Sequence, residues 1–91
     1  MYSIEASKYF LRRAKKFFKK HPDLKRQFAE IVDDMREDPF QPHLALHSLS
    51  GRLQDCYAVR LTYSYRVTLT LMVTKKAIIL LDIGSHDEVY T

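Results

Sequence analysis

Apolar residues recur with the period of an α-helix over residues 8–20, and basic residues occupy most of the positions between them. Ser7 lies directly before this segment and provides the hydroxyl of a helix N-cap. The pattern predicts an amphipathic, strongly basic helix over residues 8–20. Its apolar stripe consists of Phe10, Leu11, Ala14, Phe17 and Phe18.

A second helix is predicted after a short break. Pro22 lacks a backbone donor and disfavours helix at the preceding residue, yet it suits the first turn of a new helix. The helical period then continues and stops before Pro39, with largely acidic residues at the exposed positions. The two segments therefore predict a helical hairpin. The apolar stripe of the second helix consists of Leu24, Phe28, Ile31, Val32 and Met35.

The period changes to two in the second half of the chain. Apolar and polar residues alternate over residues 53–61 and again over 65–73, which predicts two antiparallel strands. Residues 77–83 are apolar on both faces, as a central strand would be. Lys75 and Lys76 predict a tight turn before that strand.

The remaining segments carry weaker signals. Residues 2–6 alternate and are expected to form an edge strand. Residues 39–51 contain two prolines and little periodicity, so we expect a connecting loop with one helical turn. Residues 84–91 are expected to form a C-terminal tail. Together these elements predict an α+β fold, in which a small antiparallel sheet of about four strands packs against the N-terminal helical hairpin.

Length and composition narrow the class of protein. The 91 residues are 46% hydrophobic, enough for one core, so we expect a single domain over residues 1–91. No apolar stretch approaches the length of a membrane span and the first residues lack the pattern of a signal peptide, which predicts a cytoplasmic protein without membrane contact. The single cysteine, Cys56, fits a reducing compartment and favours neither a disulfide nor a metal site. We expect no metal and no cofactor.

Positive charge is concentrated near the N-terminus. Residues 1–26 hold nine Lys or Arg and two acids, residues 27–38 one and five, and residues 39–91 five and four, which gives +7, −4 and +1 within a total of +4. Such a basic segment is typical of proteins that bind phosphates, although a lysine run alone is better explained by a solvated helix face. The phosphate-binding candidates in the first helix are Arg12, Arg13, Lys15, Lys16, Lys19 and Lys20.

Strand parity brings two further arginines together. If the apolar positions of the two alternating strands face the core, Arg60 and Arg66 both emerge on the opposite face, close to each other. An anion that accepts hydrogen bonds from both side chains would explain two like charges at this place. Alternatively, each arginine pairs with an acid such as Asp55 or Asp82, or lies in solvent. Parity leaves both explanations open.

Three residues near this face are candidates for proton transfer and substrate orientation. His86 is a natural acid–base group, since imidazoles titrate near neutral pH. Tyr90 provides a phenol that could stack on a base or bind a phosphate, or that could anchor the C-terminus in the core. His47 lies in the loop where its ring could join the same cleft, whereas His21 and His43 are expected to be ordinary surface residues.

The order of these features resembles a known family. A basic helical hairpin is followed by the segments His47–Gly51, Cys56–Arg60, Tyr65–Val67 and Gly84–Tyr90. Over nearly the whole chain, this succession resembles the RelE/ParE superfamily of toxin–antitoxin toxins. Within it, the chain resembles the RelE-type messenger-RNA endonucleases, including the YafQ-like members, more than the ParE gyrase poisons. The resemblance implies a concave basic sheet face that enters the ribosomal A site and cuts the messenger.

The resemblance also implies residue roles. Arg66 matches the arginine with which these nucleases hold the scissile phosphate, and Arg60 stands where the RelE type has a lysine. Ala58 departs from the pattern, because RelE-type toxins often place another lysine there. We also count Arg52 among the phosphate-binding candidates. His86 and His47 match histidines of the YafQ-like members, and Tyr90 matches the C-terminal tyrosine of RelE.

A metal-independent reaction fits these residue types. RNA supplies the 2′-hydroxyl nucleophile, so the enzyme needs a base, an acid and a cation. We expect His86 and His47 to divide the acid–base work and Arg66 with Arg60 to stabilise the phosphorane, while Tyr90 orients the nucleotide.

The implied partners are a RelB-like cognate antitoxin encoded alongside, the ribosome with its messenger, and operator DNA through the antitoxin complex only. A ParE-like gyrase inhibitor, a free-standing ribonuclease and a degenerate antitoxin-binding partner remain as alternatives.

Overall fold

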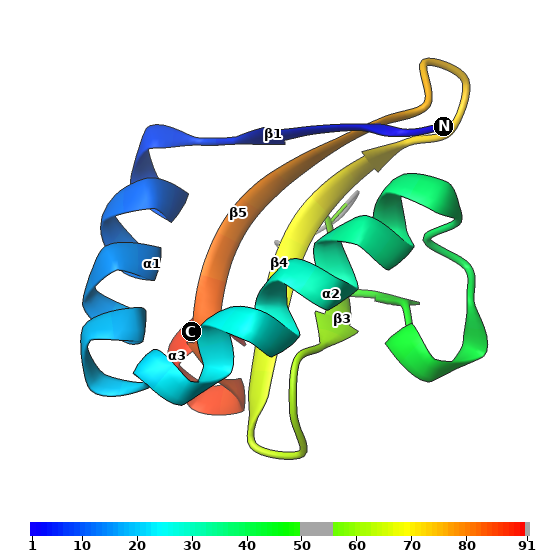
Figure 1. Ribbon diagram of the computed structural model, residues 1–91. Coiled ribbons are helices and arrows are strands. Elements are labelled where there is room, and N and C mark those ends of the chain that lie inside the picture. Colours follow the sequence, from blue (N-terminus) through cyan, green and yellow to red (C-terminus); the bar gives the residue numbers. More distant parts are fainter. Residues whose placement is uncertain (50–55, 91) are drawn as a thin grey trace.

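The computed structural model describes residues 1–49 and 56–90, apart from the side chain of Tyr90. Within these residues, one mixed sheet has the strand order β1-β5-β4-β3-β2 (Figure 1). Its outer strand β1 runs parallel to β5, and the other neighbours are antiparallel. The strands are β1 Ser3–Ala6, β2 His47–Ser48, β3 Cys56–Arg60, β4 Tyr65–Met72 and β5 Ala77–Ser85.

The predicted helical hairpin is confirmed. Helix α1 spans Lys8–Lys20, and the amide of Phe10 donates to the Ser7 hydroxyl over 3.0 Å, as expected for an N-cap. A 3-10 turn at Pro22–Leu24 leads into α2, Lys25–Glu37. The helix ends there because Asp38 is extended, as the residue before a proline prefers.

The α+β class is confirmed, while the sheet differs in detail from about four antiparallel strands. Residues 2–6 were expected at an edge, and β1 lies there in a parallel pair. The loop expected over residues 39–51 contains the predicted helical turn at Pro42–Leu44, but also β2, which pairs with β3. A strand of two residues is too short to show alternation. Residues 53–55 of the predicted strand lie outside the described residues, as does Arg52.

The core lies between the two long helices and one face of the sheet, called here the helix face. Thr68 pairs with Asp82 whereas Leu69 pairs with Leu80, so β5 has one extra residue at this point. This irregularity lets Leu80 and Ile83 both reach the core, although a regular strand would send them to opposite faces. The buried core consists of Phe10, Phe17, Ile31, Met35, Leu44, Val59, Leu61, Val67, Leu69, Ile78, Leu80 and Ile83.

A short helix, α3 (His86–Tyr90), replaces the tail expected at the C-terminus. It contacts β5 and β4, and Figure 1 shows it at the end of β5. A Cβ atom added at Gly84 would lie 3.2 Å from the Cβ of Glu88, so glycine permits this close approach. None of the helices in the described part of the chain is long and apolar enough to cross a membrane.

Candidate functional site on the sheet

The strand register places the two predicted arginines opposite each other. Arg60 of β3 pairs with Arg66 of β4, and the adjacent pair is Val59 with Val67. Both valines are fully buried on the helix face, so the arginines project from the opposite face, called here the open face. The sequence-based prediction that they are neighbours on one non-core face is confirmed.

Arg66 also makes hydrogen bonds to the backbone of the turn before β4. Its Nη1 donates to the backbone carbonyls of Thr62, Tyr63 and Tyr65, at 3.0, 3.1 and 3.2 Å. These bonds close the turn between β3 and β4 and hold the guanidinium at that end of the sheet. Nε and Nη2 have no hydrogen-bond acceptor within the described residues, and they are the donors that remain for a ligand.

Asp82 does not neutralise these arginines. Its Oδ1 accepts from Arg13 Nε at 2.8 Å and from the amide of Ile83 at 2.8 Å. Arg60 is exposed and makes no ion pair with a carboxylate of residues 1–49 or 56–90. The other acid considered, Asp55, lies outside these ranges. The structure therefore rules out Asp82 as the partner of the arginine pair.

His86 directly follows β5, the strand that pairs with β4 beside Arg66. On the side away from β3, β4 pairs with β5, and Arg66 lies opposite Gly84. Strand β5 ends at Ser85, one residue before His86. The imidazole is exposed, with its Nδ1 3.6 Å from the carboxylate of Asp87. Tyr90 is the last residue of α3. Its predicted role depends on its side chain, which lies outside the part that the structure describes.

His47 approaches from the other edge of the sheet. It pairs with Ala58, which pairs in turn with Thr68, and its Nδ1 lies 2.9 Å from the Ala45 carbonyl. Standard strand spacing and rise put its Cα roughly 12 Å from that of Arg66. His47 and His86 are thus separated by the arginine pair. Ala58, in the position where RelE-type toxins often carry lysine, is fully buried.

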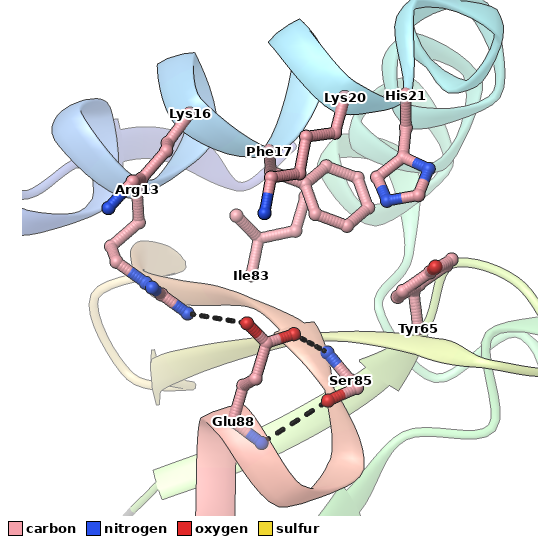
Figure 2. A pocket seen from close by; sticks show the side chains of 9 residues that line it. All are labelled: Arg13, Lys16, Phe17, Lys20, His21, Tyr65, Ile83, Ser85 and Glu88. Carbon is pink, nitrogen blue, oxygen red and sulfur yellow. Dashed lines mark hydrogen bonds and ion pairs between the residues drawn. The ribbon is translucent and has the colours of Figure 1, made fainter.

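The basic residues of α1 are divided between two surfaces. Arg13 is half-buried and its hydrogen bond to Asp82 raises the pKa of its guanidinium. Arg13, Lys16 and Lys20 line a pocket of about 280 Å³ on the helix face, called here the α1–β5 pocket (Figure 2). Its other lining residues are Phe17, His21, Tyr65, Ile83, Ser85 and Glu88. Lys15 and Lys19 instead lie beside a separate shallow hollow with Leu11 and Phe18.

Comparisons with known proteins decide the fold family. No family model matches the chain, and no curated protein matches it. Among solved structures, it is similar to YafQ from E. coli strain BL21(DE3), with a TM-score of 0.83, 15% identity and coverage of 100% of both chains. The chain has the RelE/YafQ-like toxin fold. It is also similar to a metal-bound toxin from Helicobacter pylori, with a TM-score of 0.80, 28% identity and coverage of 98% of this chain and 99% of that one.

A third similar structure is the YoeB-YefM complex from Staphylococcus aureus, with a TM-score of 0.73, 15% identity and coverage of 94% of this chain and 98% of that one. The predicted resemblance to the RelE/ParE superfamily is therefore confirmed at the level of the fold. Within the described residues of this chain, no three His, Cys, Asp or Glu side chains are grouped to hold a metal ion.

Two parts of the structure were not predicted from the sequence. Helix α3 starts with a capping box: the Glu88 amide donates to Ser85 Oγ, and the Ser85 amide donates to Glu88 Oε1 over 2.9 Å. The spacing Ser-x-x-Glu is visible in the sequence and could have predicted the helix. The α1–β5 pocket was not predicted either, since only the fold brings Tyr65 and Ser85 next to α1.

Proposed function

We propose that this protein is the toxin of a type II toxin–antitoxin module and that it cuts messenger RNA on the ribosome. The observation that carries the proposal is the pairing of Arg60 with Arg66 on the open face of a RelE/YafQ-like toxin fold. Two guanidiniums without a described carboxylate partner provide a site for a phosphate. His86 follows directly after the neighbouring strand.

The reaction needs no nucleophile from the protein. The 2′-oxygen of the RNA bonds to phosphorus and the bond from phosphorus to the 5′-oxygen breaks, which leaves a cyclic phosphate and a 5′-hydroxyl. A base takes the proton of the 2′-hydroxyl, and an acid gives a proton to the leaving oxygen. Arg60 and the free donors of Arg66 stabilise the negative charge that develops on the phosphorane.

The positions of the two histidines support a division of this work. Attack and departure take place on opposite sides of the phosphorus atom, so base and acid must approach from opposite sides. His47, on β2, and His86, after β5, lie on opposite sides of the arginine pair. They are therefore assigned to proton transfer, and Tyr90 to the orientation of the nucleotide. No step of this reaction requires a metal.

The partners follow from the same proposal. A cognate antitoxin, RelB-like and encoded alongside, binds the toxin, as the YoeB-YefM complex of similar fold supports. The ribosome presents the messenger, and exposed lysines of α1 contact ribosomal RNA phosphates. Operator DNA is contacted only through the antitoxin complex. The protein acts in the cytoplasm.

Expression with and without the neighbouring gene tests the proposal. We expect growth arrest without that gene and new messenger 5′ ends on ribosomes, both suppressed by co-expression. Purified protein should cut ribosome-bound messenger faster than naked RNA. Equal cleavage of both substrates would instead assign a free-standing ribonuclease, and no cleavage with no toxicity would assign a degenerate partner.

Ala58, whose buried methyl group stands where RelE-type toxins often carry a lysine, leaves a catalytically degenerate partner as an alternative. A second candidate is a gyrase inhibitor, since the fold is also similar to a YoeB/ParE toxin from Agrobacterium tumefaciens, with a TM-score of 0.75, 10% identity and coverage of 92% of this chain and 98% of that one. This function needs no acid–base residue. Toxicity that survives loss of both His86 and Tyr90, with accumulation of gyrase–DNA complexes, would select it.

A further inference from the structure

The α1–β5 pocket lies on the other side of the sheet from the arginine pair. Tyr65 and Ile83, which line it, share the helix face with Val67, whereas Arg66 projects from the open face. Figure 2 shows α1 along one side of the pocket, and β5 and α3 along the other. Among the predicted catalytic residues whose side chains the structure describes, none lines this pocket, so any binding there is a separate property.

The pocket carries an excess of positive charge. Arg13, Lys16 and Lys20 follow one another at spacings of three and four on α1, which puts them on one face of the helix. Among the described lining residues there is one carboxylate, that of Glu88, which accepts from the Ser85 amide and lies 3.8 Å from Arg13 Nη2. Lys20 also helps to lower the pKa of Glu88 through its positive charge, but one carboxylate does not balance three cations. Lys16 and Lys20 form no ion pair with a carboxylate in the described part of the chain. An anion in the pocket would relieve their mutual repulsion.

Aromatic rings and a hydroxyl complete the pocket. The rings of His21 and Tyr65 have centroids 4.8 Å apart, and both pack against Phe17, at 4.7 and 5.0 Å. Ser85 Oγ accepts from the Glu88 amide, so its own proton can still be donated to a ligand. Cations beside half-buried rings are the combination that holds a phosphate together with a nucleic-acid base.

We propose that the α1–β5 pocket binds one nucleotide of single-stranded RNA. The backbone phosphate lies on Lys16 and Lys20, and the base lies against Tyr65 and His21. A volume of about 280 Å³ is of the size of a single nucleotide. RNA is favoured over an acidic peptide because a carboxylate side chain makes no use of the ring faces. The choice of RNA rests on the proposed function, but the binding requires no cleavage.

Binding of a 2′-O-methyl decaribonucleotide tests the proposal, because this RNA lacks the nucleophile and cannot be cut. Fluorescence anisotropy at constant ionic strength should show that the pair of substitutions Lys16→Gln and Lys20→Gln weakens binding about tenfold or more. Lys75→Gln with Lys76→Gln removes the same charge in the turn between β4 and β5 and should change Kd by less than about twofold. Equal weakening by both pairs overturns the proposal.

Two further ligands distinguish binding of the nucleotide base from binding of the phosphate charge. An abasic oligomer with the same phosphates should bind wild-type protein about fivefold more weakly or worse. Equal binding of the abasic oligomer, or equally tight binding of a polyglutamate peptide of the same charge, also overturns the proposal. Circular dichroism of each variant checks the fold. RNA binding without messenger cleavage would contradict the proposed endonuclease activity alone.

Discussion

Arg13 Nε lies 2.8 Å from Asp82 Oδ1, and this contact joins α1 to β5 across 69 positions of the chain. Both side chains are largely shielded from water, with 26% and 14% of their surfaces exposed. Asp82 also accepts from the amide of Ile83, which orients its carboxylate. The pair therefore fixes the helix against the strand that leads to α3.

Loss of this pair should destabilise the fold. Arg13→Gln removes a hydrogen bond between charged groups and leaves a half-buried carboxylate, so we expect the free energy of unfolding to fall by about 1–2 kcal/mol. Urea denaturation measures the change. Asp82→Asn and the double variant complete a mutant cycle, in which additive effects would show that the two side chains do not interact.

Glu88 should make stability depend on acid pH. Its hydrogen bond from the Ser85 amide is the main cause that lowers the pKa of its carboxyl. A folded pKa below the unfolded value gives stability that is present above about pH 4.5 and is lost as the pH falls through the folded pKa. Glu88→Gln should therefore lower the urea midpoint at pH 7, and its difference from wild type should shrink towards pH 3. A constant difference over this range would contradict the prediction.

Gly84→Ala should displace α3. The added Cβ would lie 3.1 Å from Glu88 Oε1 and 3.2 Å from Glu88 Cβ, closer than atoms of these kinds normally approach. We expect a loss of about 1–3 kcal/mol of stability, as for other overpacked positions. Amide chemical shifts of residues 85–90 should change while those of α2 do not. Unchanged shifts in α3 would mean that the helix does not rest on this glycine.

His86→Gln should lower messenger cleavage by about 10²–10⁴-fold, the usual contribution of general acid–base catalysis. The side chain is exposed, so the folded state should persist, as thermal denaturation can check. His43→Gln provides a matched control, since His43 is also exposed but contacts Asp34. Cleavage at the wild-type rate by the His86 variant on programmed ribosomes would remove this residue from the mechanism.

Reversal of two charges on α1 should weaken ribosome binding. Lys15→Glu with Lys16→Glu changes one residue beside each of the two surfaces of the helix. If both lysines contact phosphates, the slope of log K against log salt should become shallower by about 1–2. The same reversal at Lys75 and Lys76 should leave the slope unchanged. Unaltered binding across the salt series would contradict a docking role for α1.

Much of the fold could be predicted because its signals are local. The hairpin of α1 and α2 follows from apolar spacing, the Ser7 cap and two prolines, and α1 begins and ends at the predicted residues. β2 could not be predicted, since two residues become a strand only through pairing with β3. The capping box of α3 was present in the sequence, but its place against the sheet depends on Gly84.

The candidate site divides in the same way. Alternation along two strands was enough to place Arg60 and Arg66 on one face, because side-chain direction follows strand parity. The alternation could not predict that Asp82 pairs with Arg13, or that Arg66 uses its Nη1 to close the turn between β3 and β4. The α1–β5 pocket likewise joins residues 13–21 to residues 65–88. Sequence by itself thus determined the elements and the faces of their residues, whereas tertiary packing alone decided which distant charges neutralise each other and which remain for a ligand.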